Sequence, residues 1–335
     1  MSSAGWFVEN SIVMNVRPRR LRKTPALRQL VQENSISISN LVLPLFIKAG
    51  KDIKNPISSM PGHFQLSIDN LSAEIDEIKK LKIPAVILFG IPEKKDATGS
   101  AALDDNGIIQ RALKLIKKIA PEILIITDLC FCEYTDHGHC GAWDAEKKCV
   151  DNDATLKLLQ KQAISHAKAG ADIIAPSGMM DGMVQAIRIA LDENNFKDIP
   201  ILSYAVKYAS CFYGPFRQAA EGAPQFGDRK HYQMNPANSD EAIREAMLDV
   251  QEGADMLMVK PAQNYLDIIY RVKKEFPYLP LCAYQVSGEF AMIKAAAEKK
   301  WIDHDAAMLE SLLAIKRAGA DFIITYFAKE VGRIL

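Results

Sequence analysis

The sequence has 335 residues, of which 49% are hydrophobic and 24% charged, and its 41 basic side chains balance 41 acidic ones. This composition is typical of a globular protein, and zero net charge excludes a global attraction to nucleic acid or an anionic membrane. The sequence contains no run of roughly 18–20 apolar residues and no recognisable secretory signal. We therefore expect a cytoplasmic protein, in which clustered cysteines bind metals or react rather than form disulfides.

The first distinctive segment, residues 17–33, is basic and contains Pro18 and Pro25. Such a segment is typical of an extended arm that packs on a neighbouring subunit, and a nucleic-acid arm or part of a transit peptide are the alternatives. We expect residues 1–35 to form an N-terminal arm with a role in oligomerisation. Residues 36–335 are expected to form one catalytic domain.

Beyond residue 40, short apolar runs alternate with longer amphipathic segments. The predicted strands are residues 41–47, 85–90, 123–130, 172–177, 201–207, 256–261, 281–288 and 322–327. Strands that are buried on both faces have continuous apolar runs of this kind. The predicted helices, with apolar residues spaced by three and four, include residues 71–82, 107–120, 154–169, 241–250 and 265–276.

Three joints between a helix and the next strand have nearly the same sequence. They read AGAD at 169–172, EGAD at 252–255 and AGAD at 318–321. A glycine just past a helix end commonly stops the helix in the left-handed conformation. Eight repeated strand–helix units predict an α/β fold, the (β/α)8 TIM barrel, which needs about 250 residues. An open doubly wound sheet is the alternative, but no glycine-rich phosphate loop follows the first strand.

A barrel of this kind carries its chemistry at the carboxyl ends of its strands. The residues expected there are Asp128, Cys130, Cys132, Lys207, Lys260, Ser287 and Tyr326. Each lysine follows an apolar run, so desolvation would lower its pKa and leave an amine that forms a Schiff base with a ketone. The alternative is an ammonium paired with a carboxylate at the barrel mouth, but two lysines on adjacent strands favour catalysis.

Residues 128–141 read DLCFCEYTDHGHCG and contain three of the six cysteines. Cys130 and Cys132 point the same way if the segment is extended, and Cys140 returns on the following loop. Three thiolates would bind zinc and leave a fourth position open, as in catalytic sites, unless His137 or His139 closes it. Three buried cysteines without a metal are the alternative. The other cysteines are Cys211, a weaker candidate ligand, and Cys149 and Cys282, for which no function is predicted.

The segment after the fifth strand, residues 208–240, is long and contains Arg217, Arg229 and Lys230. Loops of this length are usually lids or binding loops. Arginines in such a loop suit a substrate carboxylate, because the guanidinium forms forked hydrogen bonds with it. A solvated loop with scattered charges is the alternative.

Seven stretches of the sequence together resemble one enzyme family. They are DLCFCEYTDHGHCG, APSGMMDG, SYAVKYASCFYGPFR, GDRKHYQMNP, MLMVKPAQNYLD, AYQVSGEFAMI and RAGADFIITYFA. In this order, from about residue 17 to the C-terminus, they resemble the 5-aminolevulinate dehydratase (porphobilinogen synthase) family, in its zinc-dependent form. The resemblance implies a lyase that condenses two 5-aminolevulinate molecules to porphobilinogen, with loss of two waters, in tetrapyrrole and haem biosynthesis.

The resemblance also implies roles for individual residues. Lys260 in MLMVKP would form the Schiff base with the first substrate, and Lys207 in SYAVKY would be the second active-site lysine. The implied carboxylate-binding residues are Ser287 and Tyr326 for one substrate, and Arg217, Arg229 and Gln233 for the other. The implied zinc ligands are Cys130, Cys132 and Cys140, at positions where zinc-independent members carry aspartates.

Some family members also bind magnesium away from the active site, which implies Glu245 as a ligand of an allosteric Mg²⁺. The alternative is a surface carboxylate beside Arg244. The family commonly forms homo-octamers in which the N-terminal arm embraces a neighbour. The general base is open between Asp128 and Asp181, both expected near strand ends.

Two other functions fit part of the sequence. A class I Schiff-base aldolase would use Lys260 but leave the thiols without a role. A catalytically inactive, zinc-stabilised assembly protein would use the thiols and the arm, but not two strand-end lysines. Metal removal should leave an aldolase active, unfold the assembly protein, and inactivate the dehydratase without unfolding it.

Overall fold

The computed structural model describes residues 16–335. The chain divides into two compact units, Met1–Ser35 and Ile36–Leu335. In the first unit, the described residues form a short 3-10 helix, Pro18–Arg22, and helix α1, Pro25–Leu30. Helix α1 begins at a cap in which the Thr24 hydroxyl accepts the Leu27 backbone N–H at 3.2 Å. The rest of the predicted arm, residues 1–15, lies outside the described residues.

The second unit is built on eight parallel strands. They are β1 (Leu41–Lys48), β4 (Ala85–Ile91), β5 (Leu124–Leu129), β8 (Ile173–Pro176), β9 (Leu202–Lys207), β10 (Met256–Lys260), β11 (Leu281–Gln285) and β12 (Phe322–Thr325). Neighbours pair in the order β8-β5-β4-β1-β12-β11-β10-β9, and a parallel bridge between Ile174 and Ile201 joins the two ends. The sheet therefore closes on itself, and the predicted (β/α)8 barrel is confirmed.

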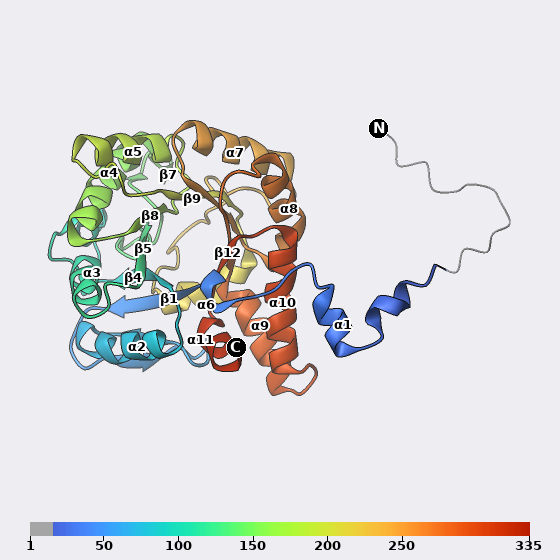
Figure 1. The fold of residues 1–335 in the computed structure, drawn as a ribbon. Coiled ribbons are helices and arrows are strands. Elements are labelled where there is room, and N and C mark those ends of the chain that lie inside the picture. The colour runs from blue at the N-terminus through green and yellow to red at the C-terminus, as the bar shows by residue number, and fades with distance from the viewer. Residues whose placement is uncertain (1–15) are drawn as a thin grey trace. The chain divides into compact units, whose positions relative to one another are not determined.

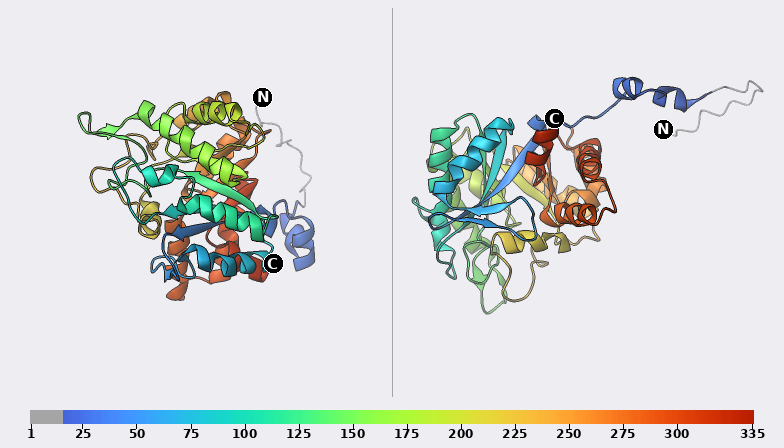
Figure 2. Two further views of the ribbon diagram at one scale, coloured as in Figure 1. Left: turned by 90° about the vertical axis from the view of Figure 1, so that its left-hand side faces the viewer. Right: turned by 90° about the horizontal axis from the view of Figure 1, so that it is seen from below.

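Helices surround these strands (Figure 1). They are α2 (Ile68–Lys80), α3 (Ile108–Ile119), α4 (Asn152–Ala169), α5 (Met183–Glu193), α6 (Gly214–Ala219), α7 (Asp240–Gln251), α8 (Leu266–Glu275), α9 (Ser287–Glu298), α10 (His304–Ala318) and α11 (Ala328–Ile334). Figure 2 shows α2, α3 and α4 following one another around the outside of the barrel. Within residues 16–335, no helix combines the length and apolar character needed to cross a membrane.

The strands have the burial that their apolar runs predict. Every residue of β4 and of β9 is buried, because barrel side chains pack inward on one face and helices cover the other. The three glycines of the repeated joints have positive φ angles: 104° at Gly170, 102° at Gly253 and 120° at Gly319. The joint sequence thus ends each helix as predicted.

The aspartate of each joint has a second role, which the sequence did not indicate. Its carboxylate accepts a backbone N–H at or next to the start of a neighbouring strand. The pairs are Asp172 with Ile125 at 2.7 Å, Asp255 with Ile201 at 2.8 Å, and Asp321 with Leu281 at 2.7 Å. The repeat therefore links consecutive barrel units at their amino-terminal ends.

The strand boundaries differ from the prediction by one to three residues, and two predicted site residues, Ser287 and Tyr326, lie just beyond their strands. Strand β11 ends at Gln285, and Ser287 opens helix α9 rather than closing a strand. The helix begins early because the Glu289 carboxylate accepts the Val286 backbone N–H at 2.8 Å.

The long segment between β9 and α7, residues 208–239, also has structure of its own. It contains a 3-10 helix, Cys211–Tyr213, and helix α6. The Ser210 hydroxyl caps the first by accepting the Phe212 N–H at 3.1 Å, and Pro215 stands in the first turn of the second. We call residues 208–239 the β9–α7 segment. The loop after β5 is likewise interrupted, by an antiparallel pair of short strands, β6 (Trp143–Asp144) and β7 (Cys149–Val150).

Candidate active site

Two lysines lie side by side at the carboxyl ends of adjacent strands. Lys207 ends β9 and Lys260 ends β10, and the two residues are partners in the parallel register. Their exposed fractions are only 5% and 6%. Both line a small cavity whose other lining residues are Phe89, Asp128, Cys132, Glu133, Ser177, Tyr213, Phe216 and Arg229. The two amines therefore share one enclosed space at the barrel mouth.

Aromatic rings surround the Lys260 amine. Its Nζ lies 4.1 Å from the ring centre of Tyr284 and between 5.1 and 5.4 Å from three further ring centres, those of Tyr204, Tyr213 and Phe216. Ring faces attract a cation, but they stabilise a buried ammonium much less than water or a carboxylate would. Burial, and after it the positive charge of Lys207, lowers the pKa of Lys260 to about 7. A substantial fraction of this amine is therefore neutral near neutral pH.

Lys207 is held differently. Its Nζ donates a hydrogen bond to the backbone carbonyl of Ser177 at 2.6 Å, and the Tyr204 ring centre lies 5.5 Å away. The hydrogen bond fixes the side chain beside Lys260, so a positive charge on Lys207 acts on its neighbour at a constant position.

Asp128 is the carboxylate that faces both lysines. Its Oδ2 accepts the Ser177 hydroxyl at 3.1 Å, and its buried Oδ1 has no hydrogen-bond partner. Burial raises the pKa of Asp128, and the charges of Lys207 and Lys260 oppose that rise. Asp181, the other candidate base, is exposed and lines a different cavity. Of the two, only Asp128 lies with the lysines.

The three predicted thiols converge next to this cavity. Cys130, Cys132 and Cys140 are all buried, and their sulfur atoms lie within 4.8 Å of one another. The Sγ atoms of Cys130 and Cys132 are 3.3 Å apart. A loop makes this possible: a Cβ on Gly141 would lie 2.3 Å from the Thr155 hydroxyl oxygen, so only glycine lets the chain pass there. Three convergent thiols form a donor set suited to a soft or borderline metal ion.

Among the described residues, neither neighbouring histidine belongs to the thiol group. The Phe226 carbonyl can only accept, so His139 Nε2 donates to it at 3.0 Å, and His139 Nδ1 accepts the Tyr232 hydroxyl at 3.3 Å. His137 Nδ1 accepts the His139 backbone N–H at 3.1 Å. Both rings are thus engaged within the protein in this structure. Cys211 is exposed and stands apart from the thiol group.

The predicted carboxylate receptors on the β9–α7 segment are only partly engaged. Arg229 is buried and donates to the carbonyls of Gly138 at 2.8 Å and Gly222 at 2.6 Å, while its Nε has no partner. Arg217 is half-buried with an unpartnered Nε, and burial together with the nearby Arg229 charge lowers its pKa. Buried donors without partners are rare in proteins. Such donors are available for a ligand.

Gln233 is buried and neither end of its amide has a partner. It lines a second cavity, which has no lining residue in common with the lysine cavity. Its place in a substrate site stays a prediction.

Ser287 and Tyr326 are buried, and their hydroxyls already have protein partners. The Ser287 hydroxyl accepts the Phe216 backbone N–H at 2.9 Å. The Tyr326 and Tyr284 hydroxyls are 3.0 Å apart. Tyr284 connects this pair to Lys260 through its ring. To donate to a carboxylate, the Ser287 hydroxyl would give up its donation to the Phe212 carbonyl at 3.4 Å. The Tyr326 hydroxyl would donate to the ligand while it accepts from Tyr284.

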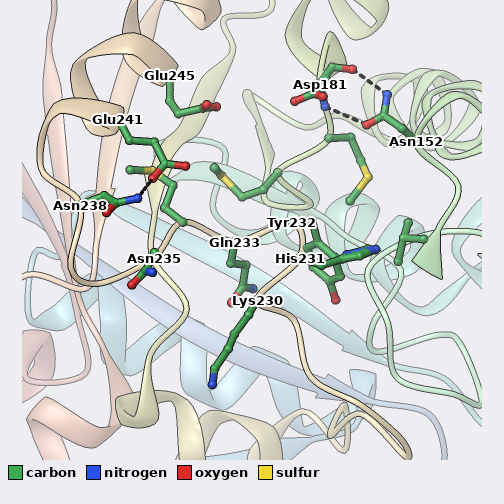
Figure 3. Close-up of a pocket in the computed structure, with 14 residues that line it drawn as sticks. Asn152, Asp181, Lys230, His231, Tyr232, Gln233, Asn235, Asn238, Glu241 and Glu245 are labelled. Carbon is green, nitrogen blue, oxygen red and sulfur yellow. Dashed lines mark hydrogen bonds between the residues drawn. The ribbon is translucent and has the colours of Figure 1, made fainter. Parts of the chain in front are cut away.

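Glu245 lines the same second cavity as Gln233, and neither Lys207 nor Lys260 lines it. Figure 3 shows Glu245, Glu241 and Asp181 around this cavity, with Asn152 bonded to Asp181. Burial, then the charges of Asp181 and Glu241, raise the pKa of Glu245. Arg244, the alternative partner, is exposed.

Several lining residues were not among the predicted ones. Ser177 ends a predicted strand, so the strand-end rule alone indicates it. Glu133 directly follows Cys132, and its buried Oε1 has no partner. Two further rings near the Lys260 amine, those of Tyr204 and Tyr284, do not line the cavity. They come from within strands β9 and β11, where nothing in the sequence separates them from ordinary core residues.

A closed parallel barrel with buried amines, a carboxylate and thiols at its carboxyl-terminal mouth is the arrangement of a (β/α)8-barrel enzyme. The family model "Delta-aminolevulinic acid dehydratase" matches residues 15–334. Two curated proteins of that name, from Halalkalibacterium halodurans and Synechocystis, are each 56% identical to this chain. The matches cover 95% of this chain and 96% of the first protein, and 96% of this chain and 98% of the second.

A solved structure leads to the same family. Delta-aminolevulinic acid dehydratase (porphobilinogen synthase) from Toxoplasma gondii, in complex with the reaction product porphobilinogen, is 45% identical with a TM-score of 0.94. The match covers 96% of this chain and 92% of the other. The chain therefore belongs to the delta-aminolevulinic acid dehydratase family. The sequence resemblance to this family is confirmed.

The contact between the thiol loop and the β9–α7 segment yields a prediction. Gly138 has a φ of +70°, and a Cβ there would lie 2.3 Å from the Ala223 carbonyl oxygen. We expect Gly138→Ala to push residues 222–229 off the thiol loop, because neither backbone has room to yield. Hydrogen exchange of amides in 222–233 should accelerate by about tenfold or more.

Gly227→Ala is the matched control for this experiment. Gly227 lies in the same segment with a φ of +61°, and nothing lies within 4 Å of its added Cβ. It imposes the same backbone strain without the clash. Equal acceleration in both variants would show that the contact at Gly138 does not hold the segment.

Proposed function

We propose that this protein condenses two molecules of 5-aminolevulinate to porphobilinogen with loss of two waters, a lyase reaction of haem and other tetrapyrrole biosynthesis. The observation that carries the proposal is the pair of buried lysines in register on β9 and β10 in a member of this family. Two ketone substrates need two carbonyl-activating groups, and two adjacent amines in one cavity can supply them.

Lys260 is the proposed nucleophile. Its pKa of about 7 leaves a neutral amine that can add to the keto carbon of the first substrate. The carbonyl oxygen then leaves as water while a carbon–nitrogen double bond forms. Lys207 supports this step because its charge, next to Lys260, favours the neutral amine. Lys207 is the proposed second active-site amine.

Asp128 is the proposed base for proton removal from substrate carbon. Its Oδ1 is buried in the same cavity and has no hydrogen-bond partner, so it is free to accept a proton. Burial raises its pKa toward the range in which a carboxyl group both takes and returns protons. The Ser177 hydroxyl keeps the carboxylate oriented through Oδ2.

The two substrate carboxylates require separate receptors. We propose Arg217, Arg229 and Gln233 for one, which the unpartnered polar atoms of these three side chains support. We propose Ser287 and Tyr326 for the other, on the family resemblance.

We propose zinc as the metal of the thiol site. Buried thiols with sulfurs within 4.8 Å fit its preference for sulfur, and Cys130, Cys132 and Cys140 would hold it with one position open. When bound there, zinc would polarise a carbonyl or hold the amine of the second substrate.

We propose that magnesium binds at Glu245 as an allosteric ion. Oxygen ligands suit Mg²⁺, and the carboxylates of Asp181 and Glu241 share this cavity with Glu245. A cation there would relieve the repulsion that raises the pKa of Glu245.

We propose that the protein is a cytoplasmic homo-octamer in which residues 1–35 embrace a neighbouring subunit. The basic composition of residues 17–33 and the family resemblance support this assembly. The six free cysteines are compatible with a compartment in which thiols stay reduced.

Trapping of the Schiff base tests the function. With 5-aminolevulinate and a borohydride reagent, peptide mass mapping should find a reduced substrate adduct on Lys260, with or without one on Lys207. The rate of trapping should fall about tenfold per pH unit below pH 7, because the ammonium is not a nucleophile. Absence of an adduct on both lysines in folded, metal-supplied protein would exclude the mechanism and favour an inactive assembly protein.

Substitution of Lys207 tests the origin of the low pKa of Lys260. Lys207→Met should move the midpoint of the trapping profile to higher pH, because a positive neighbour is lost. Lys207→Arg keeps the charge and should leave the midpoint close to that of the wild type. If the midpoint were the same in Lys207→Met as in Lys207→Arg, burial alone would set the pKa of Lys260.

Metal analysis tests the two proposed ions separately. In Cys132→Ser, zinc affinity should fall by at least about tenfold and activity with it, while thermal unfolding stays cooperative. In Glu245→Gln, magnesium should be lost and zinc retained. Cys149→Ser is the control and should retain both metals, since Cys149 lies outside the thiol group. Unfolding of the zinc-depleted protein would assign the metal a structural role instead.

Sedimentation velocity tests the assembly. The full chain should sediment as an octamer, and a chain that begins at Ile36 should form smaller species. An unchanged octamer without residues 1–35 would remove the arm from the proposed assembly.

A further inference from the structure

One acidic side chain ties the end of helix α6 to strands on the other side of the barrel mouth. Glu221 pairs through Oε1 with the Lys48 ammonium at the end of β1. The same oxygen accepts Gln65 Nε2 at 3.1 Å, from strand β3 (Phe64–Leu66). Gln65 Nε2 also donates to the Ala219 carbonyl at 2.7 Å, and the Lys95 ammonium donates to the Glu221 carbonyl. Four hydrogen bonds or ion pairs thus meet within three residues of chain.

The backbone at this point is in an unusual conformation. Glu221 has a φ of +51°, in the left-handed region that non-glycine residues rarely adopt. Residues held in such a conformation usually depend on their surroundings to stay there. The contacts to Lys48, Gln65 and Lys95 supply that constraint.

These contacts hold the part of the β9–α7 segment that carries Arg217 and Arg229. Arg217 precedes Glu221 by four residues, and its carbonyl accepts the Gly222 N–H at 3.2 Å. Arg229 donates to the Gly222 carbonyl at 2.6 Å. Glu221 does not line the lysine cavity, although Phe216 and Arg229 do. Any influence of Glu221 on that cavity therefore acts through the position of the segment.

We infer that Glu221 is a positioning residue, whose anchor to Lys48, Gln65 and Lys95 holds Arg229 at the lysine cavity and Arg217 near Arg229, and so sets affinity for a substrate carboxylate. The affinity part rests on the proposed function, in which these arginines bind a carboxylate. The anchoring part rests on the contacts alone.

The exposure of the pair gives the anchor a characteristic response to salt. The side chains of Lys48 and Glu221 are 25% and 42% exposed, so dissolved ions screen their attraction. High salt should therefore loosen the segment in the wild type. A variant without the Glu221 charge should respond less.

Two variants of the full chain separate charge from backbone strain. Glu221→Gln keeps the length and an accepting oxygen but loses the charge. Glu221→Gly loses every side-chain contact and, as glycine, adopts the positive φ without strain. The matched control is Asp192→Asn, which breaks a pair with Arg188 of similar exposure, 18% and 45%, on helix α5.

Hydrogen exchange without substrate is the first measurement. We expect amides of residues 214–233 to exchange about threefold faster in Glu221→Gln and about tenfold faster in Glu221→Gly, with no change in Asp192→Asn. The KM for 5-aminolevulinate should rise by about threefold in Glu221→Gln with kcat nearly unchanged. Raising salt from about 0.05 M to about 0.5 M should raise the wild-type KM more than that of the variant.

Each outcome decides one part. The contacts to the Ala219 and Glu221 carbonyls remain in Glu221→Gly, so unchanged exchange at 214–233 in this variant would overturn the anchoring role of the Glu221 side chain. Faster exchange with an unchanged KM would overturn the link from anchor to substrate affinity. A wild-type protein that makes no porphobilinogen would overturn the proposed function and the affinity part with it, while the exchange result would still decide the anchor.

Discussion

The site depends on the parallel register of β9 and β10, which places Lys207 and Lys260 next to each other out of water. Two ammonium groups this close in a poorly hydrated cavity repel each other and lack the solvation that a charge needs. Release of a proton from Lys260 relieves both penalties, which is why its pKa falls to about 7. Repulsion and lost solvation make the buried pair of lysines unfavourable for folding, and the same two effects give one of its amines the neutral form that acts as a nucleophile.

The other residues at the barrel mouth help to keep the pKa of Lys260 low. The rings around Lys260 exclude water without offering a counter-charge, so the amine is not returned to the ammonium form by an ion pair. Asp128 and Glu133 are the exceptions, because both line the cavity and the charge of each carboxylate raises the pKa of Lys260 against the effect of burial. Ser177 links Asp128 to Lys207, because its hydroxyl donates to the Asp128 carboxylate and its backbone carbonyl accepts a hydrogen bond from the Lys207 amine. Ser177, which directly follows β8, thereby orients both the proposed base and the proposed second amine.

The barrel and its chemical groups could be predicted because local sequence determines them. Continuous apolar runs mark buried strands, and the strand-end rule indicates Lys207, Lys260 and the first two thiols. What could not be predicted depends on contacts between distant segments. The bond between Tyr284 and Tyr326 joins strand β11 to the residue that follows β12, and the pairing of Lys48 with Glu221 spans 173 residues. Ser287 was misplaced because a side-chain cap, not the apolar run, decides where α9 begins.

The two halves of the mouth are also mechanically connected. Arg229 donates to carbonyls on both the thiol loop, at Gly138, and its own segment, at Gly222. His139 stands next to Cys140 and holds the Phe226 carbonyl of that segment. Any ligand that orders the thiol loop therefore also orders the residues that carry the arginines. Because coupling between binding sites is reciprocal, a carboxylate bound to the arginines as proposed would stabilise the thiol arrangement as much as a metal bound to the thiols would stabilise the arginines.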